Sequence, residues 1–209
     1  MSTTTKMTED YIKMHPSIKD CLKKGVLNYS ALSRLISKEL NIENKTSKEA
    51  ILVASRRYRD RLNNDYLENE ILELFKNSRL EIKNKISVLI VKKNIYYEEL
   101  IEIEKKIKNE QGIFFTIEGT KTITIIVQDQ DKILIEKKLG KNISSKKGNL
   151  SLIIIYSPGI ERTPGSVAFL TGLFFENGIN IVEIMSTCND TLIIVESKEI
   201  SRVIDFLTF

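Results

Sequence analysis

The chain has 209 residues, of which 42% are hydrophobic and 29% charged, proportions that are ordinary for a globular protein. That length allows two or three small domains, each with its own core. No stretch approaches the ~20 apolar residues that a membrane span requires, so no membrane partner is expected. The polar N-terminus does not resemble a signal peptide, and Cys21 and Cys188 form no metal-ligand pattern. These features predict a cytoplasmic protein with free thiols.

The positive charge of the chain is concentrated near its N-terminus. The net charge is +4, yet residues 1–62 contain 13 Lys and Arg against 7 Asp and Glu. The rest of the chain therefore has 19 basic against 21 acidic residues. An anionic partner is expected to bind the N-terminal segment.

Helical signals alone occupy the first third of the chain. Thr46 and Glu49 are spaced as a capping box, in which each side chain satisfies the other's backbone N–H group. The helix that they start is predicted to reach about Leu62, and the pattern is compatible with a continuation to Lys76. We expect an all-helical unit over residues 1–80.

The hydrophobic period changes from helical to strand-like near residue 84, and one order of elements then occurs twice. This predicts an α+β protein in which the helical unit precedes two tandem βαββα modules, residues 84–140 and 149–209, joined by a polar linker. The first module is expected to contain a strand at 86–91, a helix at 96–108, strands at 113–117 and 122–127 and a helix at 131–139. The second is expected to contain a strand at 150–156, a helix at 164–176, strands at 180–187 and 191–196 and a helix at 198–207.

Little in the sequence indicates catalysis. The single histidine, His15, precedes a proline at a predicted helix end, where a structural role is the commoner one. The chain has no glycine-rich phosphate loop, no G-x-S-x-G nucleophile turn and no cluster with metal-ligand spacing. The carboxylates of residues 98–104 lie at helical spacing from lysines, as on a solvated face. We expect neither enzymatic activity nor a cofactor.

The sharpest local feature is the segment of residues 161–166, Glu-Arg-Thr-Pro-Gly-Ser. Thr163 suits a helix N-cap, Pro164 the first helical position, and Gly165 would let another group approach the backbone closely. A helix N-terminus carries unpaired N–H groups and partial positive charge, which suit a carboxylate ligand. The alternative is an ordinary, well-capped helix.

The wider C-terminal sequence resembles the ACT domain, and is most similar to the regulatory ACT modules of aspartokinases. The resemblance rests on Pro164-Gly165, on the Asn-Gly-Ile-Asn-Ile turn at 177–181 and on Ser186-Thr187, which occur in the family's order. It implies ferredoxin-like modules that pair side by side, in a homodimer or larger homo-oligomer, with an amino acid held between them. The implied ligand contacts are Thr163, Pro164, Gly165, Ser166, Asn180 and Ile181, with Ser186 and Thr187 as weaker candidates.

Two departures from the ACT pattern are visible. The family unit ends in a fourth strand, whereas this sequence stops at Phe209, directly after the last predicted helix. In the first module Lys93-Asn94-Ile95-Tyr96 stands where the Pro-Gly motif would be. The resemblance therefore implies a ligand site in the second module only.

The N-terminal segment resembles a small helix-turn-helix or winged-helix-like unit, similar to those of archaeal ACT-containing regulators. This resemblance rests on residues 25–36 and on the following helix with its paired arginines. On that helix the predicted core face is Ala50, Ile51, Ala54, Tyr58 and Leu62. The candidate contacts to double-stranded DNA are Lys48, Ser55, Arg56, Arg57 and Arg59, on the other face or its flanks.

These features predict an amino-acid-sensing regulatory protein whose modules control DNA binding by the helical unit. The alternative is a regulatory subunit or adaptor that docks on an amino-acid biosynthetic enzyme and does not bind DNA. The sequence does not identify the amino acid, because the backbone groups of the predicted site can bind any α-amino acid.

Overall fold

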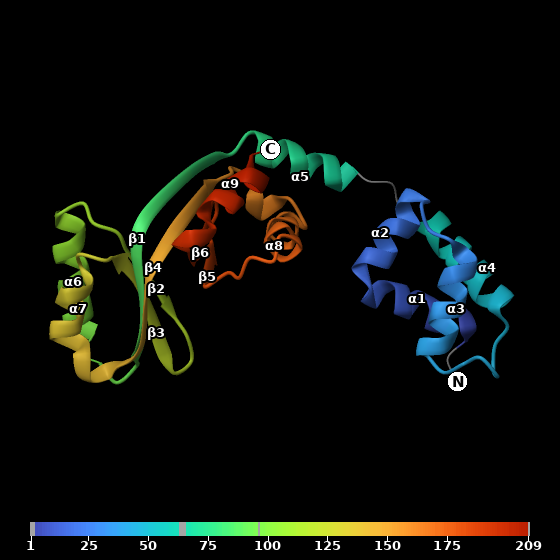
Figure 1. The fold of residues 1–209 in the computed structure, drawn as a ribbon, viewed down its shortest axis with the longest axis horizontal. Coiled ribbons are helices and arrows are strands. Elements are labelled where there is room, and N and C mark those ends of the chain that lie inside the picture. Colours follow the sequence, from blue (N-terminus) through green and yellow to red (C-terminus); the bar gives the residue numbers. More distant parts are fainter. Residues whose placement is uncertain (1–2, 63–65, 96, 209) are drawn as a thin grey trace. The chain divides into compact units, whose positions relative to one another are not determined.

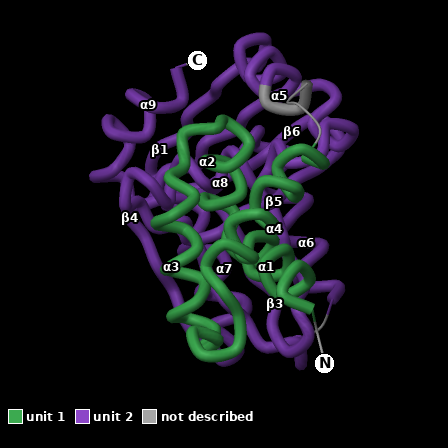
Figure 2. The backbone as a smooth tube through the Cα atoms, turned by 90° about the vertical axis from the view of Figure 1, so that its right-hand side faces the viewer, with its two compact units in different colours: residues 1–66 green, residues 67–209 purple. Residues whose placement is uncertain are grey.

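The computed structural model describes residues 3–62, 66–95 and 97–208. The chain divides into two compact units, residues 1–66 and 67–209, which Figure 2 shows in different colours. No helix in the described ranges is long and apolar enough to cross a membrane.

Unit 1, residues 1–66, is built from helices around a small apolar core. The left-handed conformation of Gly25, with φ of +70°, ends its second helix. Its helices are α1 (Thr4–Met14), α2 (Pro16–Lys24), α3 (Tyr29–Glu39) and α4 (Lys48–Arg61). Its buried core consists of Tyr11, Ile12, Leu22, Leu32, Ile36, Ile42, Ile51 and Tyr58.

The start of α4 differs from the predicted capping box. Ser47, not Thr46, is the N-cap, because the Ser47 hydroxyl accepts a hydrogen bond from the N–H of Ala50 at 3.2 Å. The Thr46 hydroxyl instead bonds the hydroxyl of Thr4 at 3.0 Å, tying the start of α4 to that of α1. The predicted continuation to Lys76 is also wrong, since α4 ends at Arg61 and a separate helix begins at residue 66. Residues 63–65 lie outside the described ranges.

Unit 2, residues 67–209, is a six-stranded antiparallel sheet with helices. Its strand order is β2-β3-β1-β4-β6-β5, and the sheet is curled (Figure 1). Its strands are β1 (Arg79–Lys92), β2 (Phe114–Glu118), β3 (Thr122–Gln128), β4 (Ile143–Tyr156), β5 (Glu183–Ser186) and β6 (Asp190–Glu196). Its α-helices are α5 (Tyr66–Lys76), α6 (Tyr97–Asn109), α7 (Lys132–Leu139), α8 (Ser166–Glu176) and α9 (Ile200–Leu207), with single 3-10 turns at Gly140–Asn142, Ile160–Arg162 and Ser197–Glu199.

The two central strands, β1 and β4, each serve both halves of the sheet. The first half of β1, residues 79–83, pairs with residues 152–156 of β4, beside β6. Residues 143–147 of β4 in turn pair with the second half of β1, beside β3. Each βαββα repeat thus gains a fourth strand from the other repeat. The predicted polar linker is accordingly wrong, because residues 143–147 are strand.

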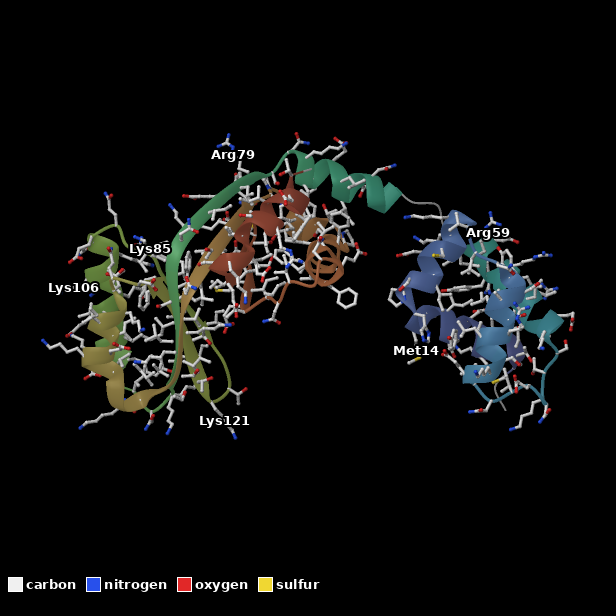
Figure 3. All side chains as sticks on the ribbon, in the orientation of Figure 1. Met14, Arg59, Arg79, Lys85, Lys106 and Lys121 are labelled. Carbon is white, nitrogen blue, oxygen red and sulfur yellow. The ribbon has the colours of Figure 1, made fainter. Side chains whose placement is uncertain are left out.

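Both long strands bend where they pass from one half of the sheet to the other. Lys85 (labelled in Figure 3) and Asn149 have φ of +59° and +58°, and the pairing register shifts beside them. At this crossing the buried Ser151 hydroxyl donates to the side-chain oxygen of Asn84 at 2.8 Å. A residue with left-handed backbone changes the alternation of side chains along the strand, so the side chains after it point to the opposite face from the one expected. Both halves of each long strand can therefore bury their apolar side chains.

Three apolar clusters hold unit 2 together. The first joins α5, α8 and α9 to β4 and β6, and the second joins α6 and α7 to β1 and β3 (Figure 1). The third lies on the alternate side chains of the same strands and includes residues from both halves of the sheet. Its fully or nearly fully buried members are Ile86, Val88, Ile126, Leu150, Leu152, Leu192 and Ile194.

Candidate functional site

The Pro-Gly motif forms a tight turn immediately before α8. The N–H of Ser166 donates to the carbonyl of Thr163 at 3.2 Å, closing a four-residue turn with Pro164 in its second position. Gly165 has φ of +89° and ψ of −7°, the values of the third position of a type II turn. A side chain there would be strained, which explains the glycine. Thr163 is consequently not the N-cap that was predicted, since α8 begins at Ser166 with Gly165 as its N-cap.

The two hydroxyl groups of this turn are used by the protein itself. The Thr163 hydroxyl donates to the carbonyl of Gly159 at 3.2 Å, and the buried Ser166 hydroxyl donates to that of Ile160 at 3.0 Å. Of the first four N–H groups of α8, those of Ser166 and Phe169 donate to the carbonyls of Thr163 and Gly165, so those of Val167 and Ala168 are left for a ligand. The turn can therefore bind an anion through backbone dipoles rather than through side-chain hydroxyls.

Asn180 and Ile181 lie at the other end of α8. Asn180 is exposed, Ile181 packs against the α5–α8–α9 cluster, and both precede β5, which begins three residues later than predicted. The 11 residues of α8 separate them from the Pro-Gly turn. At 1.5 Å per residue this is roughly 16 Å, more than a free amino acid can bridge. One chain does not bring the two predicted halves of the site together.

Charged groups surround the loop that precedes the turn. Arg162 lies 3.5 Å from Glu161, and its side chain is 85% exposed. A hydrogen bond from Cys188 to the Glu161 carboxylate, with the charge of that carboxylate, raises the pKa of the thiol. This contact places the β5–β6 turn beside the loop. At the first residue of the loop, the buried Ser157 hydroxyl has no hydrogen-bond partner among the described residues.

Helix α5 packs on this loop, a contact that sequence reasoning missed. Phe75 is 1% exposed, and its ring stacks on that of Phe169 in α8 with 5.7 Å between centroids. The Cδ1 atom of Ile71 lies 3.5 Å from the position that a Cβ on Gly165 would take. The side chain beside Gly165 thus comes from α5 and leaves room for a Cβ, so the turn conformation rather than close packing requires the glycine. The apolar spacing of residues 71–75 could have predicted a buried helix face, but not its partner.

In the first repeat, the loop between β1 and α6 corresponds to the loop between β4 and α8, and it presents a different surface. A hollow there is lined by Lys92, Lys93 and Lys121 (Lys121 is labelled in Figure 3), with no Pro-Gly turn. Lys93 pairs with Glu118 at 2.6 Å and holds the pKa of that carboxyl below its usual value. Tyr96, the last residue of the predicted replacement motif, lies outside the described residues.

The basic helix α4 presents some, not all, of its predicted contacts. Lys48 and Arg57 are exposed, as are Arg56 and Arg59. Arg56 lies over the Tyr29 ring at 5.3 Å, and Arg59 (labelled in Figure 3) donates to the Tyr29 hydroxyl at 3.4 Å.

Two residues of α4 were assigned to the wrong face of the helix. Ser55 is fully buried and donates to the carbonyl of Ile51 at 2.9 Å, so it does not share the exposed basic face. Ala50, predicted for the core, is exposed, whereas Ile51, Ala54 and Tyr58 are buried as predicted. Across the described parts of both units, no cluster of three His, Cys, Asp or Glu residues could hold a metal ion.

Comparison with known proteins gives a structural likeness only. No protein-family model matches the sequence, and no curated protein matches it. Aspartate kinase from Clostridium acetobutylicum superposes with a TM-score of 0.52 at 15% identity, over 62% of this chain and 33% of that enzyme. A structure of aspartokinase α and β subunits gives 0.50 at 13% identity, over 63% and 94% of the two chains. The regulatory subunit of aspartate kinase from Thermus flavus gives 0.49 at 11% identity, over 62% and 94%.

The chain shares its fold with part of the aspartokinases. It spans about a third of the length of the Clostridium enzyme. This likeness in fold agrees with the resemblance of the C-terminal sequence to ACT modules.

Proposed function

We propose that the protein is an amino-acid-sensing regulator in which two ACT-type modules pair and hold the ligand between them. The observation that carries this proposal is the Pro-Gly turn at the N-terminus of α8, set in a fold shared with part of an allosteric aspartate kinase. A preformed turn that presents backbone N–H groups suits the carboxylate of any amino acid.

The topology explains why two copies would be needed. Strands β4 and β5 are both antiparallel to β6, so they run in the same direction. The loop after β4 and the segment before β5 therefore lie toward opposite ends of one module. A second copy related by a two-fold axis would reverse one module, and its residues 180–181 would meet the turn of the first.

The outer surface of α8 supports such pairing. Phe175 is 84% exposed and Val167 is 38% exposed, although both belong to a helix with apolar residues on every side. Gly172 lies between them, and a Cβ there would meet nothing within 4 Å. Strand β5 is the free edge of the sheet next to this helix. An apolar helix face beside an unpaired strand edge is a surface that a second copy can cover.

The test uses two variants that each damage one half of the site. Calorimetry and thermal shift with each standard amino acid would first identify the ligand. We expect neither Asn180→Ala nor Gly165→Val to bind it, whereas an equimolar, re-equilibrated mixture should recover about a quarter of the sites, since half of the dimers are mixed and each has one intact site. A Glu98→Gln variant, exposed on α6 and outside both the predicted contacts and the α8 surface, is the folding control. Absence of recovery would refute the shared site, and absence of any ligand would refute sensing.

We further propose that unit 1 is the output element and binds duplex DNA through α4. Arg57 is exposed, and no side-chain ion pair is seen for it among the described residues, so it is free to meet a phosphate. Arg57→Ala should weaken binding and reduce the slope of log K against log salt by about one. Lys108→Ala, on α6 and paired with Glu104 at 2.6 Å, is the matched control and should leave the slope unchanged.

Exposed apolar side chains in unit 1 favour the alternative of a protein-docking adaptor. Met14 is 80% exposed and Val26 is 73% exposed. Such side chains suit a protein partner better than a phosphate backbone. If the chain shows no salt-dependent binding to duplex DNA at low ionic strength, docking on a biosynthetic enzyme replaces DNA control as the proposed output.

A further inference from the structure

Helix α5 lies where the two units of the chain join, and it is packed on the loop that leads into α8. Unit 2 begins at residue 67, one residue after the start of α5. Ile71 and Phe75 belong to the same buried cluster as α8 and α9. The second repeat thus packs against a helix that precedes both repeats in the sequence. Among the described residues, no such additional helix contributes to the apolar cluster of the first repeat.

The contacts between α5 and the loop are close at two glycines. Ile71 Cδ1 lies 3.5 Å from the Cβ position of Gly165, and Leu74 Cδ1 lies 4.0 Å from that of Gly159. Both glycines have left-handed backbones, with φ of +89° and +95°. A side chain at either position would meet α5 as well as strain the backbone. Helix α5 therefore lies beside both glycines, near enough that an added Cβ would be in ordinary van der Waals contact with it.

Between α5 and the loop a hollow of about 500 Å³ remains. Glu70 and Glu73 line it from α5, and Arg162 and Thr163 line it from the loop. Glu73 is paired with Lys76 at 2.8 Å and Arg162 with Glu161 at 3.5 Å, while no ion pair is seen for Glu70 among the described side chains. The hollow thus offers a carboxylate on one wall and a guanidinium on the other, the complement of an ammonium and a carboxylate on one small molecule.

We propose that this hollow is part of the same ligand site, where the ammonium group of the amino acid meets Glu70 and Arg162 joins the N–H groups at the start of α8 in binding its carboxylate, and that its occupancy holds α5 on the module. This inference rests on the proposed sensing function and adds α5 as a wall of the site. Binding tightens α5 rather than displacing it, because displacement would expose Ile71 and Phe75 to water. Because α5 begins at the boundary between the two units in the sequence, ligand binding in the hollow would change the stability of the segment that links unit 2 to unit 1.

The test measures hydrogen exchange and affinity in the full chain. For each standard amino acid that binds, exchange of the amides of residues 69–76 should slow by more than that of α6 amides, which serve as an internal reference. Glu70→Gln should weaken binding by about tenfold or more, the effect of losing one charge-assisted hydrogen bond. Glu98→Gln, an exposed substitution on α6, should leave the affinity unchanged.

The outcomes separate this inference from the function on which it rests. Binding with unchanged exchange in α5 and unchanged affinity of Glu70→Gln would overturn the role of α5, while amino-acid sensing would stand. Binding of no standard amino acid would overturn both.

Discussion

The packing of α5 on α8 predicts a large cost for one substitution, Phe75→Ala. Phe75 is 1% exposed, and its ring lies 5.7 Å from that of Phe169, so truncation would leave a cavity between the two helices. Burial of this extent predicts a loss of about 3–5 kcal/mol in the free energy of unfolding of unit 2. For a domain of this size the loss corresponds to a fall in Tm of roughly 10 °C. Differential scanning calorimetry of the full chain measures it.

The control for Phe75→Ala is the same substitution at Phe175. Phe175 is 84% exposed on α8, so Phe175→Ala should change the stability of the monomer by no more than about 0.5 kcal/mol. The unfolding of unit 1 should be unchanged in both variants. If Phe75→Ala cost as little as Phe175→Ala, α5 would not be packed on the module in solution, and the α5 wall of the hollow would be refuted with it.

Three further predictions test other parts of the structure. Gly165→Ala should destabilise unit 2 by about 1–2 kcal/mol, because the φ of +89° is strained for alanine; an unchanged urea midpoint would contradict the turn. Hydrogen bonds from Lys198 and Lys147 lower the pKa of Glu196 to about 2. The ion pairs of Glu196 with these lysines therefore stabilise the fold fully above pH 4.5, the ordinary pKa, and this contribution is lost as the pH falls toward 2. NMR titration should show that Lys198→Met raises this pKa; an unchanged value would mean that the pair does not form. The fragment 84–140 should give a poorly dispersed NMR spectrum, unlike 67–209, because it keeps β3 but lacks residues 143–147 of β4, which pair with residues 88–91 on the other side of β1. A folded spectrum would show that these residues are dispensable.

Much of the local structure could be predicted from the sequence. The helices and strands of both repeats are in the predicted order, because each segment has a clear hydrophobic period and ends in a turn signal such as Gly178. Residues 79–83 and 143–147 were not expected to be strands, since both segments are short and contain only one or two apolar residues among charged or polar ones. They are strands only because each pairs with a strand from the other repeat, and a single-sequence pattern contains no information on such pairing.

For the candidate site, the turn motif could be predicted from the sequence, but the helix that packs beside it could not. The motif at 163–166 indicated a glycine that lets another group approach the backbone closely. The φ of +89° requires the glycine instead, since an added Cβ would lie at an ordinary contact distance of 3.5 Å from Ile71 Cδ1. Ile71 lies 94 residues earlier than Gly165. The spacing of apolar residues predicts which face of α5 is buried, whereas its position depends on shape complementarity with two left-handed glycines. Those glycines can be identified from sequence, but their partner cannot. A substitution at Ile71 should therefore perturb the turn as strongly as one within the motif.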